Sequence, residues 1–168
     1  MVCLNKYLKD FENDVAKLNL SANSIHKIDG LDDFIKLKYL DLSHNIIKKI
    51  EGLENLVNLT YLNLSHNQIT KIEGLEKLNN LKYLGLFSNK IEKIENIMHL
   101  RRLEKFFHFC NPILYTPPNI QRFLDRMRNR ENIYDNSQSV HDSDVQNSIT
   151  KSIYNLLSNP NNFEEIFI

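Results

Sequence analysis

Cysteine, glycine and proline are scarce in this sequence, and tryptophan is absent. The 168 residues include two cysteines, Cys3 and Cys110, four glycines and four prolines. The cysteines show no metal-ligand spacing, which favours a reducing compartment. The first residues, MVCLNKYLKD, lack the apolar segment of a secretory signal, and no apolar run approaches the roughly 20 residues that cross a bilayer. We therefore expect an intracellular, cytoplasmic protein without a membrane partner.

A surplus of charge of either sign is also missing. Lys plus Arg number 21 and Asp plus Glu number 21, so the formal net charge is zero. Proteins that bind nucleic acid usually carry a basic surplus, so we expect no nucleic-acid partner. The sequence contains no phosphate-cradling glycine loop, zinc motif or calcium loop. We accordingly expect no cofactor and no metal site.

What the sequence does contain is a repeat. A block of 22 residues recurs four times without insertion and then begins a fifth time, at Val15, Leu37, Leu59, Leu81 and Leu103. The third copy reads LTYLNLSHNQITKIEGLEKLNN. An unbroken period of this length means that each unit stacks on a copy of itself. Stacked arrays of this kind commonly present a surface to another molecule.

Each unit has two halves with different periodicity. In the first half, LxxLxLxxN, leucines such as Leu62 and Leu64 alternate as in a short strand with one buried face. In the second half, apolar residues such as Ile47 and Ile50 follow a threefold step that suits a tight 3₁₀-like turn. Strands on one side and bulkier segments on the other must curve. The pattern therefore predicts an α/β solenoid with a concave parallel β-sheet, a 3₁₀ or turn convex side and helical caps.

Two further positions recur in every unit. An asparagine after the strand can bond backbone groups that the turn leaves unpaired, so a buried amide row is expected. The row consists of Asn23, Asn45, Asn67, Asn89 and Asn111. The second position holds Gly30, Gly52, Gly74 and, in the fourth unit, Asn96. Glycine and asparagine tolerate positive φ, so a left-handed backbone is predicted there.

The array needs terminal units that cover its open ends. Residues 1–14 carry apolar side chains at helical spacing, namely Leu4, Tyr7, Leu8 and Phe11, and are predicted to form an N-terminal helical cap. Residues 15–118 form the repeats, four and a half in number. Residues 119–131 follow two prolines and are predicted as a C-terminal cap helix. Residues 132–168 are predicted as a polar linker followed by a helical tail.

Side chains that alternate with the inward leucines form columns on the concave face. Three stacked tyrosines, Tyr39, Tyr61 and Tyr83, predict a binding surface, because tyrosine gives a large contact area at low entropic cost. The neighbouring columns add Asp41 and Asn63 for polar selectivity, Phe87 and Phe107 as an apolar patch, and His44 and His66. Two alternatives stay open. The tyrosines could only stabilise the sheet by cross-strand packing, and the C-terminal helix could cover Phe107.

Catalysis and metal binding have weak support in these columns. His44 and His66 occupy one column, but its other members are not all ligands, and zinc needs three or four. Asp41, Ser43 and His44 share a strand, yet a triad needs the histidine as a bridge between the other two. We therefore predict no catalytic residue and no metal ligand.

The motif LxxLxLxxNxIxKIEGLxxLxx over residues 15–113 resembles the 22-residue class of leucine-rich repeats, typified by a regulatory subunit of protein phosphatase 1. The resemblance implies a right-handed solenoid whose concave sheet binds proteins, but it transfers no partner. The segment NPILYTPPNIQRFLDRM and the residues after it resemble the tails of leucine-rich-repeat proteins encoded by giant DNA viruses. That second resemblance implies action in the cytoplasm of an infected host cell.

Together these observations predict a non-enzymatic, monomeric protein-interaction module that binds a partner protein on its concave face. One alternative is a regulatory adaptor of a phosphatase or another enzyme. A second alternative, a hydrolase that uses serine and histidine on the strand face, is disfavoured by the positions of those residues.

Overall fold

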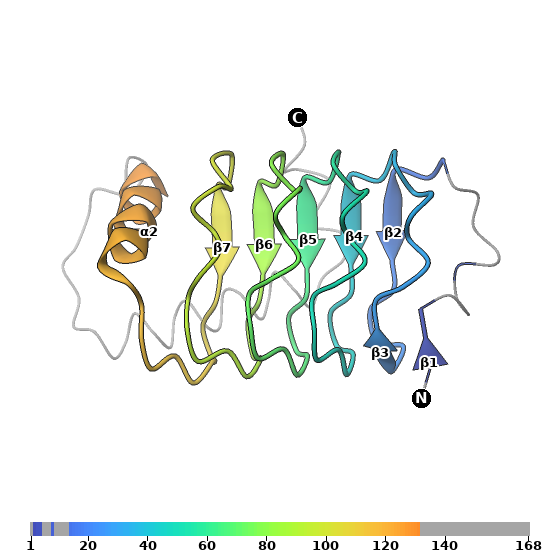
Figure 1. The fold of residues 1–168 in the computed structure, drawn as a ribbon, viewed down its shortest axis with the longest axis horizontal. Coiled ribbons are helices and arrows are strands. Elements are labelled where there is room, and N and C mark those ends of the chain that lie inside the picture. Colours follow the sequence, from blue (N-terminus) through green and yellow to red (C-terminus); the bar gives the residue numbers. More distant parts are fainter. Residues whose placement is uncertain (1, 5–7, 9–13, 132–168) are drawn as a thin grey trace. The chain divides into compact units, whose positions relative to one another are not determined.

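The structure, a computed structural model, describes residues 2–4, 8 and 14–131. Its centre is a five-stranded parallel sheet in the order β2-β4-β5-β6-β7 (Figure 1). The strands are β2 (Lys17–Asn19), β4 (Tyr39–Asp41), β5 (Tyr61–Asn63), β6 (Tyr83–Gly85) and β7 (Lys105–Phe107). Neighbouring strands pair residues that are one 22-residue period apart, such as Tyr39 with Tyr61 and Tyr61 with Tyr83. The predicted stacking of the units is therefore confirmed.

The core lies between the sheet and the convex segments. The inward leucines of the three central strand segments are fully buried, as predicted: Leu40, Leu42, Leu62, Leu64, Leu84 and Leu86. On the convex side, the Leu56 amide donates to the Leu53 carbonyl (3.0 Å) and the Leu59 amide donates to the Leu56 carbonyl (2.9 Å). Hydrogen bonds over three residues, repeated every three residues, confirm the tight turns expected from the threefold apolar step.

The asparagine row is a hydrogen-bonding ladder between successive coils. The Oδ1 atom of Asn67 accepts the Ile47 amide of the preceding coil at 2.9 Å. Its Nδ2 atom donates at 3.0 Å to two carbonyls, that of Leu42 in the preceding coil and that of Leu64 in its own coil, and at 3.3 Å to the Ser65 carbonyl. One side chain thus joins two coils at four backbone groups.

The ladder shares its carbonyl acceptors between neighbouring asparagines. The Leu42 carbonyl also accepts Nδ2 of Asn45 at 2.9 Å, and the Leu64 carbonyl also accepts Nδ2 of Asn89 at 3.0 Å. No amide is shared between two of these oxygen atoms. The Oδ1 atoms of Asn67, Asn89 and Asn111 each accept one amide of the coil before, and that of Asn45 accepts two, from Asn23 and Ile25. Buried backbone groups are costly when unpaired, so this row holds the turns after the strands in place.

The predicted left-handed positions are confirmed. Gly30, Gly52 and Gly74 have φ of 72°, 68° and 68°, and Asn96 has φ of 57°. A Cβ atom at Gly74 would also press against the Ile50 carbonyl oxygen of the preceding coil. At the equivalent position of the fourth coil, Asn96 makes a hydrogen bond instead: its Nδ2 atom donates to the equivalent carbonyl, that of Ile72, at 2.7 Å.

A second left-handed position in each coil was not predicted from the sequence. The residue before each ladder asparagine has φ between 54° and 58°, at Ala22, His44, His66, Ser88 and Cys110. None of these is glycine or asparagine, so composition gave no signal. The amide at this position donates to the next coil, for example from His44 to the Ser65 carbonyl at 2.9 Å. The hydrogen bond explains why side chains other than glycine are held in a region that most residues avoid.

The N-terminal end differs from the expected helix. Val2 and Cys3 form strand β1 (Val2–Cys3), which pairs in parallel with β3 (Ile25–Lys27), so the prediction of a helix over 1–14 is wrong at these two residues. Pairing with β3 gives the backbone N–H and C=O groups of β1 hydrogen-bond partners in the first coil. Leu4 and Leu8 are buried against the core. Tyr7 and Phe11 lie outside the described residues.

Helix α2 (Pro118–Glu131) follows the last coil, beside β7 (Figure 1). Proline fits the first helical turn, where its missing N–H group needs no partner. Ile120 is buried, and Phe123, Leu124 and Met127 pack against the core, so the helix covers the apolar end of the array. In the described part of the chain, no helix is long and apolar enough to span a membrane. The predicted linker and tail, 132–168, lie outside it.

Candidate functional site

The three tyrosines of the concave face form one continuous stack, which we name the tyrosine row. The rings of Tyr39 and Tyr61 have centroids 4.2 Å apart and planes 11° apart, and those of Tyr61 and Tyr83 are 4.1 Å and 13° apart. The strand register produces this geometry, because parallel strands place equivalent residues about 4.8 Å apart. Phe107 extends the row from β7, with its ring centroid 5.3 Å from that of Tyr83.

The rings differ in exposure. Tyr61 is 4% exposed, because its two faces are covered by its neighbours, whereas Tyr39 and Tyr83 are half-buried. Burial, together with the negative charge of Asp41, raises the pKa of Tyr39 to about 12. Burial also raises the pKa of Tyr61 and that of Tyr83 well above the usual value. The row therefore offers neutral phenols and apolar ring edges at physiological pH.

The polar column beside the row makes internal hydrogen bonds. Asp41 is 8% exposed and Asn63 is 2% exposed. Oδ1 of Asp41 accepts the Ser43 amide at 2.8 Å, and Oδ2 accepts Nδ2 of Asn63 at 3.3 Å. Oδ1 of Asn63 accepts the Ser65 amide at 3.1 Å. These side chains cap the turn after each strand, which is a different use from the contact with a partner that the sequence predicts.

The sequence did contain a signal for this capping. Asp41 and Asn63 each precede a serine by two residues, in DLS and NLS, and Asn19 does the same. An Asx side chain that accepts the amide two residues on is a common turn motif. The next strand carries Gly85 in this column, and a Cβ atom there would come within 2.5 Å of Asn63 Oδ1.

A second aromatic row lies where the chain leaves the strands. The rings of His44 and His66 stack with centroids 4.2 Å apart and planes 15° apart, and Phe87 meets His66 edge-on at 5.1 Å. Burial and the neighbouring His44 lower the pKa of His66. Phe87 is 8% exposed and Phe107 is half-buried. The structure therefore brings all the predicted face residues together, but several of them are largely covered.

This arrangement offers little to a metal ion or a catalytic reaction. Within residues 2–4, 8 and 14–131, no three histidine, cysteine or carboxylate side chains converge on one point. In the same residues, no hydrogen bond links the His44 ring to Asp41 or Ser43. Asp41 instead accepts the Ser43 backbone amide, and the His44 ring stacks on that of His66. The geometry needed by a catalytic triad is not formed by these three residues.

Comparison with known proteins identifies the repeat. A family model described as leucine rich repeat matches residues 13–69, and another, described as leucine rich repeats (2 copies), matches residues 57–113. No curated protein sequence matches the chain. The two family matches overlap and together span the whole array of coils.

Solved structures with the same architecture come from bacteria and from an insect. An internalin (InlF) of Listeria monocytogenes is 35% identical over 53% of this chain and 26% of its own, with a TM-score of 0.51. Internalin C2 of the same species is 29% identical over 61% of this chain and 46% of its own, with a TM-score of 0.58. The chain therefore spans less than half of either internalin.

A third similar structure is closer to this chain in length. One chain of the SNF/U2A′ complex of Drosophila melanogaster is 26% identical, with a TM-score of 0.60, over 76% of this chain and 79% of its own. The match therefore spans most of the length of both chains. The 22-residue period, the stacked parallel coils and both family matches lead to one conclusion: the chain belongs to the leucine-rich repeat family.

Proposed function

We propose that this protein is a non-enzymatic module that holds a partner protein on its concave strand face, with the tyrosine row as the anchor. The observation that carries the proposal is the stack itself: Tyr39, Tyr61 and Tyr83 place three aromatic rings in line across adjacent strands. Leucine-rich repeat proteins typically act as protein-interaction modules, which agrees with this role.

The stack has the physical properties of a binding anchor. Each ring is already held in place by its neighbours, so little side-chain conformational entropy is lost when a partner packs against it. Tyrosine is neutral at physiological pH with its ordinary pKa of about 10, and burial raises the pKa values further, so the row can be covered without burying a charge. Aromatic side chains of this kind dominate the binding energy of many interfaces.

The comparison with the insect structure supports the same role. That relative is a chain of the SNF/U2A′ complex, so a leucine-rich repeat array of similar length does associate with another protein. A phosphatase or other enzyme as the partner stays a prediction of the sequence.

The test replaces the two rings of the row that reach solvent. We expect the double variant Tyr39→Ala, Tyr83→Ala to lose the proteins that the wild-type chain captures from its native cell, as identified by mass spectrometry. Truncating a hot-spot residue costs about 2 kcal/mol, or about 30-fold in Kd. Tyr61 is less suitable as a probe, because at 4% exposure its replacement would also destabilise the sheet.

A matched control separates binding from folding. The variant Lys48→Ala, Lys71→Ala alters two exposed side chains of the second half of the coils and should capture the same proteins as wild type. Thermal melting of all variants shows whether they fold. Capture that survives in a folded Tyr39→Ala, Tyr83→Ala variant would assign the tyrosine row to sheet packing and refute the proposal.

A further inference from the structure

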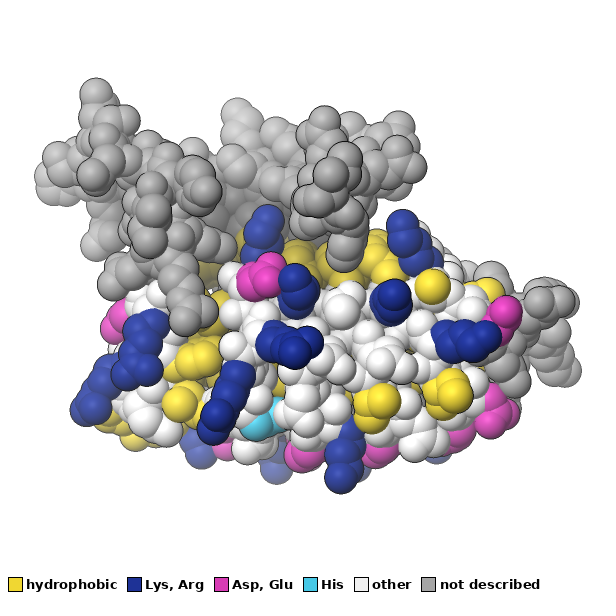
Figure 2. Space-filling model, turned by 90° about the horizontal axis from the view of Figure 1, so that it is seen from above, with side chains coloured by type: hydrophobic (Ala, Val, Ile, Leu, Met, Phe, Trp, Pro, Cys, Tyr) yellow, Lys and Arg dark blue, Asp and Glu magenta, His cyan; other side chains and the backbone are white. Residues whose placement is uncertain are grey.

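Charge is unevenly distributed although the chain is neutral as a whole. The turns that lead into β4, β5, β6 and β7 comprise residues 35–38, 57–60, 79–82 and 101–104, which we name the basic band. Five positive side chains and one negative side chain lie in these turns: Lys36, Lys38, Lys82, Arg101, Arg102 and Glu104. All six are exposed. Figure 2 looks onto this side of the array, where Lys and Arg side chains recur along its length.

Within the residues that the structure describes, most of this positive charge is not neutralised by an ion pair. Glu104 pairs with Lys82, with 3.1 Å between the carboxylate and Nζ, and Asp14 lies 3.9 Å from Lys36 Nζ. In the described part of the chain, no carboxylate lies within ion-pair distance of Lys38, Arg101 or Arg102. Exposed pairs are also weak. The band therefore presents cations that are free to meet a partner's carboxylates.

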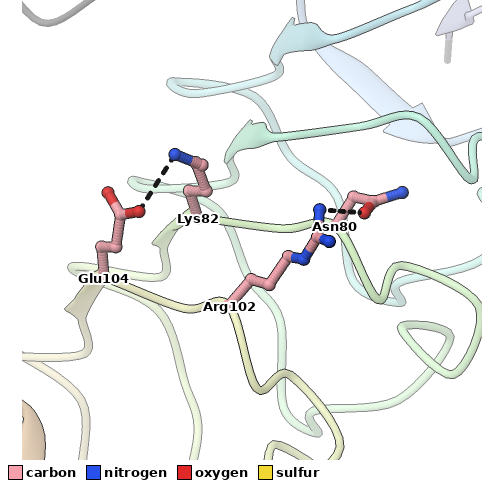
Figure 3. A network of polar contacts seen from close by, with 4 residues as sticks. All are labelled: Asn80, Lys82, Arg102 and Glu104. Carbon is pink, nitrogen blue, oxygen red and sulfur yellow. Dashed lines mark hydrogen bonds and ion pairs between the residues drawn. The ribbon is translucent and has the colours of Figure 1, made fainter.

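One of these cations is held in position. Nη1 of Arg102 donates to Asn80 Oδ1 at 2.9 Å (Figure 3). Asn80 Nδ2 in turn donates to the Val57 carbonyl at 2.9 Å. The guanidinium is thus held by an uncharged amide and not by a carboxylate that would offset its positive charge. A planar guanidinium that is already oriented loses less entropy when it binds a carboxylate with two parallel hydrogen bonds.

The basic band also carries apolar surface and borders the tyrosine row. Ile35 is 55% exposed and Val57, one coil further on, is 44% exposed. Lys38 and Lys82 directly precede Tyr39 and Tyr83. A segment lying on the row would therefore place one of its sides against both cationic and apolar groups.

We infer that the partner contributes an acidic segment, in which aspartate or glutamate is interspersed with apolar residues, and that its carboxylates meet Lys38, Arg101 and Arg102. This inference rests on the proposed binding by the strand face and specifies the chemistry of the partner. A nucleic acid fits less well. A nucleic acid carries a negative charge at every nucleotide, so the carboxylates of Asp32, Glu54 and Glu76, which lie exposed next to the band along the chain, would repel it more strongly than a segment whose acidic residues are separated by apolar ones.

The experiment uses the full chain and a defined probe, a displayed library of random peptides. Peptides selected on the wild-type chain should be enriched in Asp and Glu relative to the unselected library. Their affinity should weaken as salt rises, because the attraction between exposed charges is screened. The variant Lys38→Glu, Arg101→Glu, Arg102→Glu should bind these peptides at least about tenfold more weakly.

A matched variant controls for net charge. Lys27→Glu, Lys48→Glu, Lys71→Glu makes the same change in net charge at exposed positions outside the basic band. It should change the affinity by less than about threefold, since it removes only long-range attraction. Equal weakening by the two triple variants, or selected peptides without acidic enrichment, would overturn the inference.

The tyrosine variant separates this inference from the function on which it rests. If Tyr39→Ala, Tyr83→Ala abolishes peptide binding while the basic-band variant binds normally, the strand face binds peptides and only the acidic preference is refuted. If the tyrosine variant binds the peptides normally, the proposed function fails and the inference fails with it. In a last test, a fluorescent single-stranded oligonucleotide competes with the peptides. If it displaces them, the inference of an acidic segment is overturned in favour of a nucleic acid.

Discussion

Replacing Asn67 by alanine tests whether the asparagine ladder stabilises the array as its geometry indicates. Asn67 is 8% exposed, and its side chain makes four hydrogen bonds to backbone groups of two coils. The cost is smaller than four independent bonds suggest, because the carbonyl acceptors keep other donors. Leu42 retains Nδ2 of Asn45, and Leu64 retains Nδ2 of Asn89.

The Ser65 carbonyl likewise keeps the His44 amide, at 2.9 Å. Only the Ile47 amide loses its acceptor, which was Asn67 Oδ1. One stranded buried donor costs about 1–3 kcal/mol, and the three carbonyls, which each keep another donor, together add about 1 kcal/mol. We therefore expect the Asn67→Ala variant to lose about 2–4 kcal/mol of unfolding free energy, measured by equilibrium urea denaturation with an unchanged m-value.

Asn58→Ala is the matched control. Asn58 is exposed, and its Nδ2 atom donates to one carbonyl, that of Ile35, at 2.8 Å. Its replacement should cost about 1 kcal/mol or less. Equal losses in the two variants would refute the account of the ladder.

Asn67→Asp refines the same test through pH. The new carboxylate would keep an acceptor for the Ile47 amide but would turn an oxygen toward three carbonyls. Its pKa in the folded chain should therefore rise above the ordinary value of about 3.9. The variant should be less stable than Asn67→Ala at neutral pH and should regain stability as pH falls toward that value, because the folded state then binds the proton more tightly.

Three further predictions concern other parts of the array. Gly74→Ala should lose about 2–4 kcal/mol of unfolding free energy, because alanine is strained in the left-handed backbone and its Cβ atom clashes with a carbonyl. Gly74→Asn should lose less, because the asparagine amide can donate to that carbonyl; urea denaturation compares the two variants. Burial raises the pKa values of Tyr39, Tyr61 and Tyr83, so as pH rises the unfolded chain releases its phenolic protons before the folded chain does. Stability should therefore fall as pH rises beyond about 10. Replacing all three tyrosines by phenylalanine should flatten that decline in denaturation curves, and an unchanged slope would contradict the prediction. The lowered pKa of His66 means that the unfolded chain binds its proton first, so stability should fall below about pH 6.5, and His66→Gln should reduce this loss between pH 7 and about 5 in thermal melts.

Periodicity made most of the fold predictable. Residues such as Leu62 and Ile47 repeat at a fixed period, and a chain that stacks on itself must bury them in rows. The register of the tyrosine row followed from the same period, because neighbouring strands pair equivalent residues. Nothing beyond the spacing and the strand geometry was needed.

Hydrogen bonds between neighbouring coils were harder to predict. Sequence alternation placed Asp41 and Asn63 on the concave face, but their exposure depends on how their oxygen atoms satisfy the turn two residues later. Strand β1 (Val2–Cys3) was missed for a related reason. Its apolar neighbours have helical spacing, while its backbone pairs with residues about 23 positions away. Local patterns carry little information on such distant partners.

The direction of the asparagine ladder has a consequence for shortening the protein. The Oδ1 atoms of Asn45, Asn67, Asn89 and Asn111 each accept an amide of the coil before, so each of these earlier coils is completed by the one that follows. Deleting the segment that contains Asn111 would leave the Ile91 amide with no acceptor in the row. Trimming from the N-terminal end would leave every remaining amide that the row accepts with its acceptor. For the asparagine row, truncation should therefore be asymmetric, because only a cut at the C-terminal end removes one of its acceptors from the coil that remains.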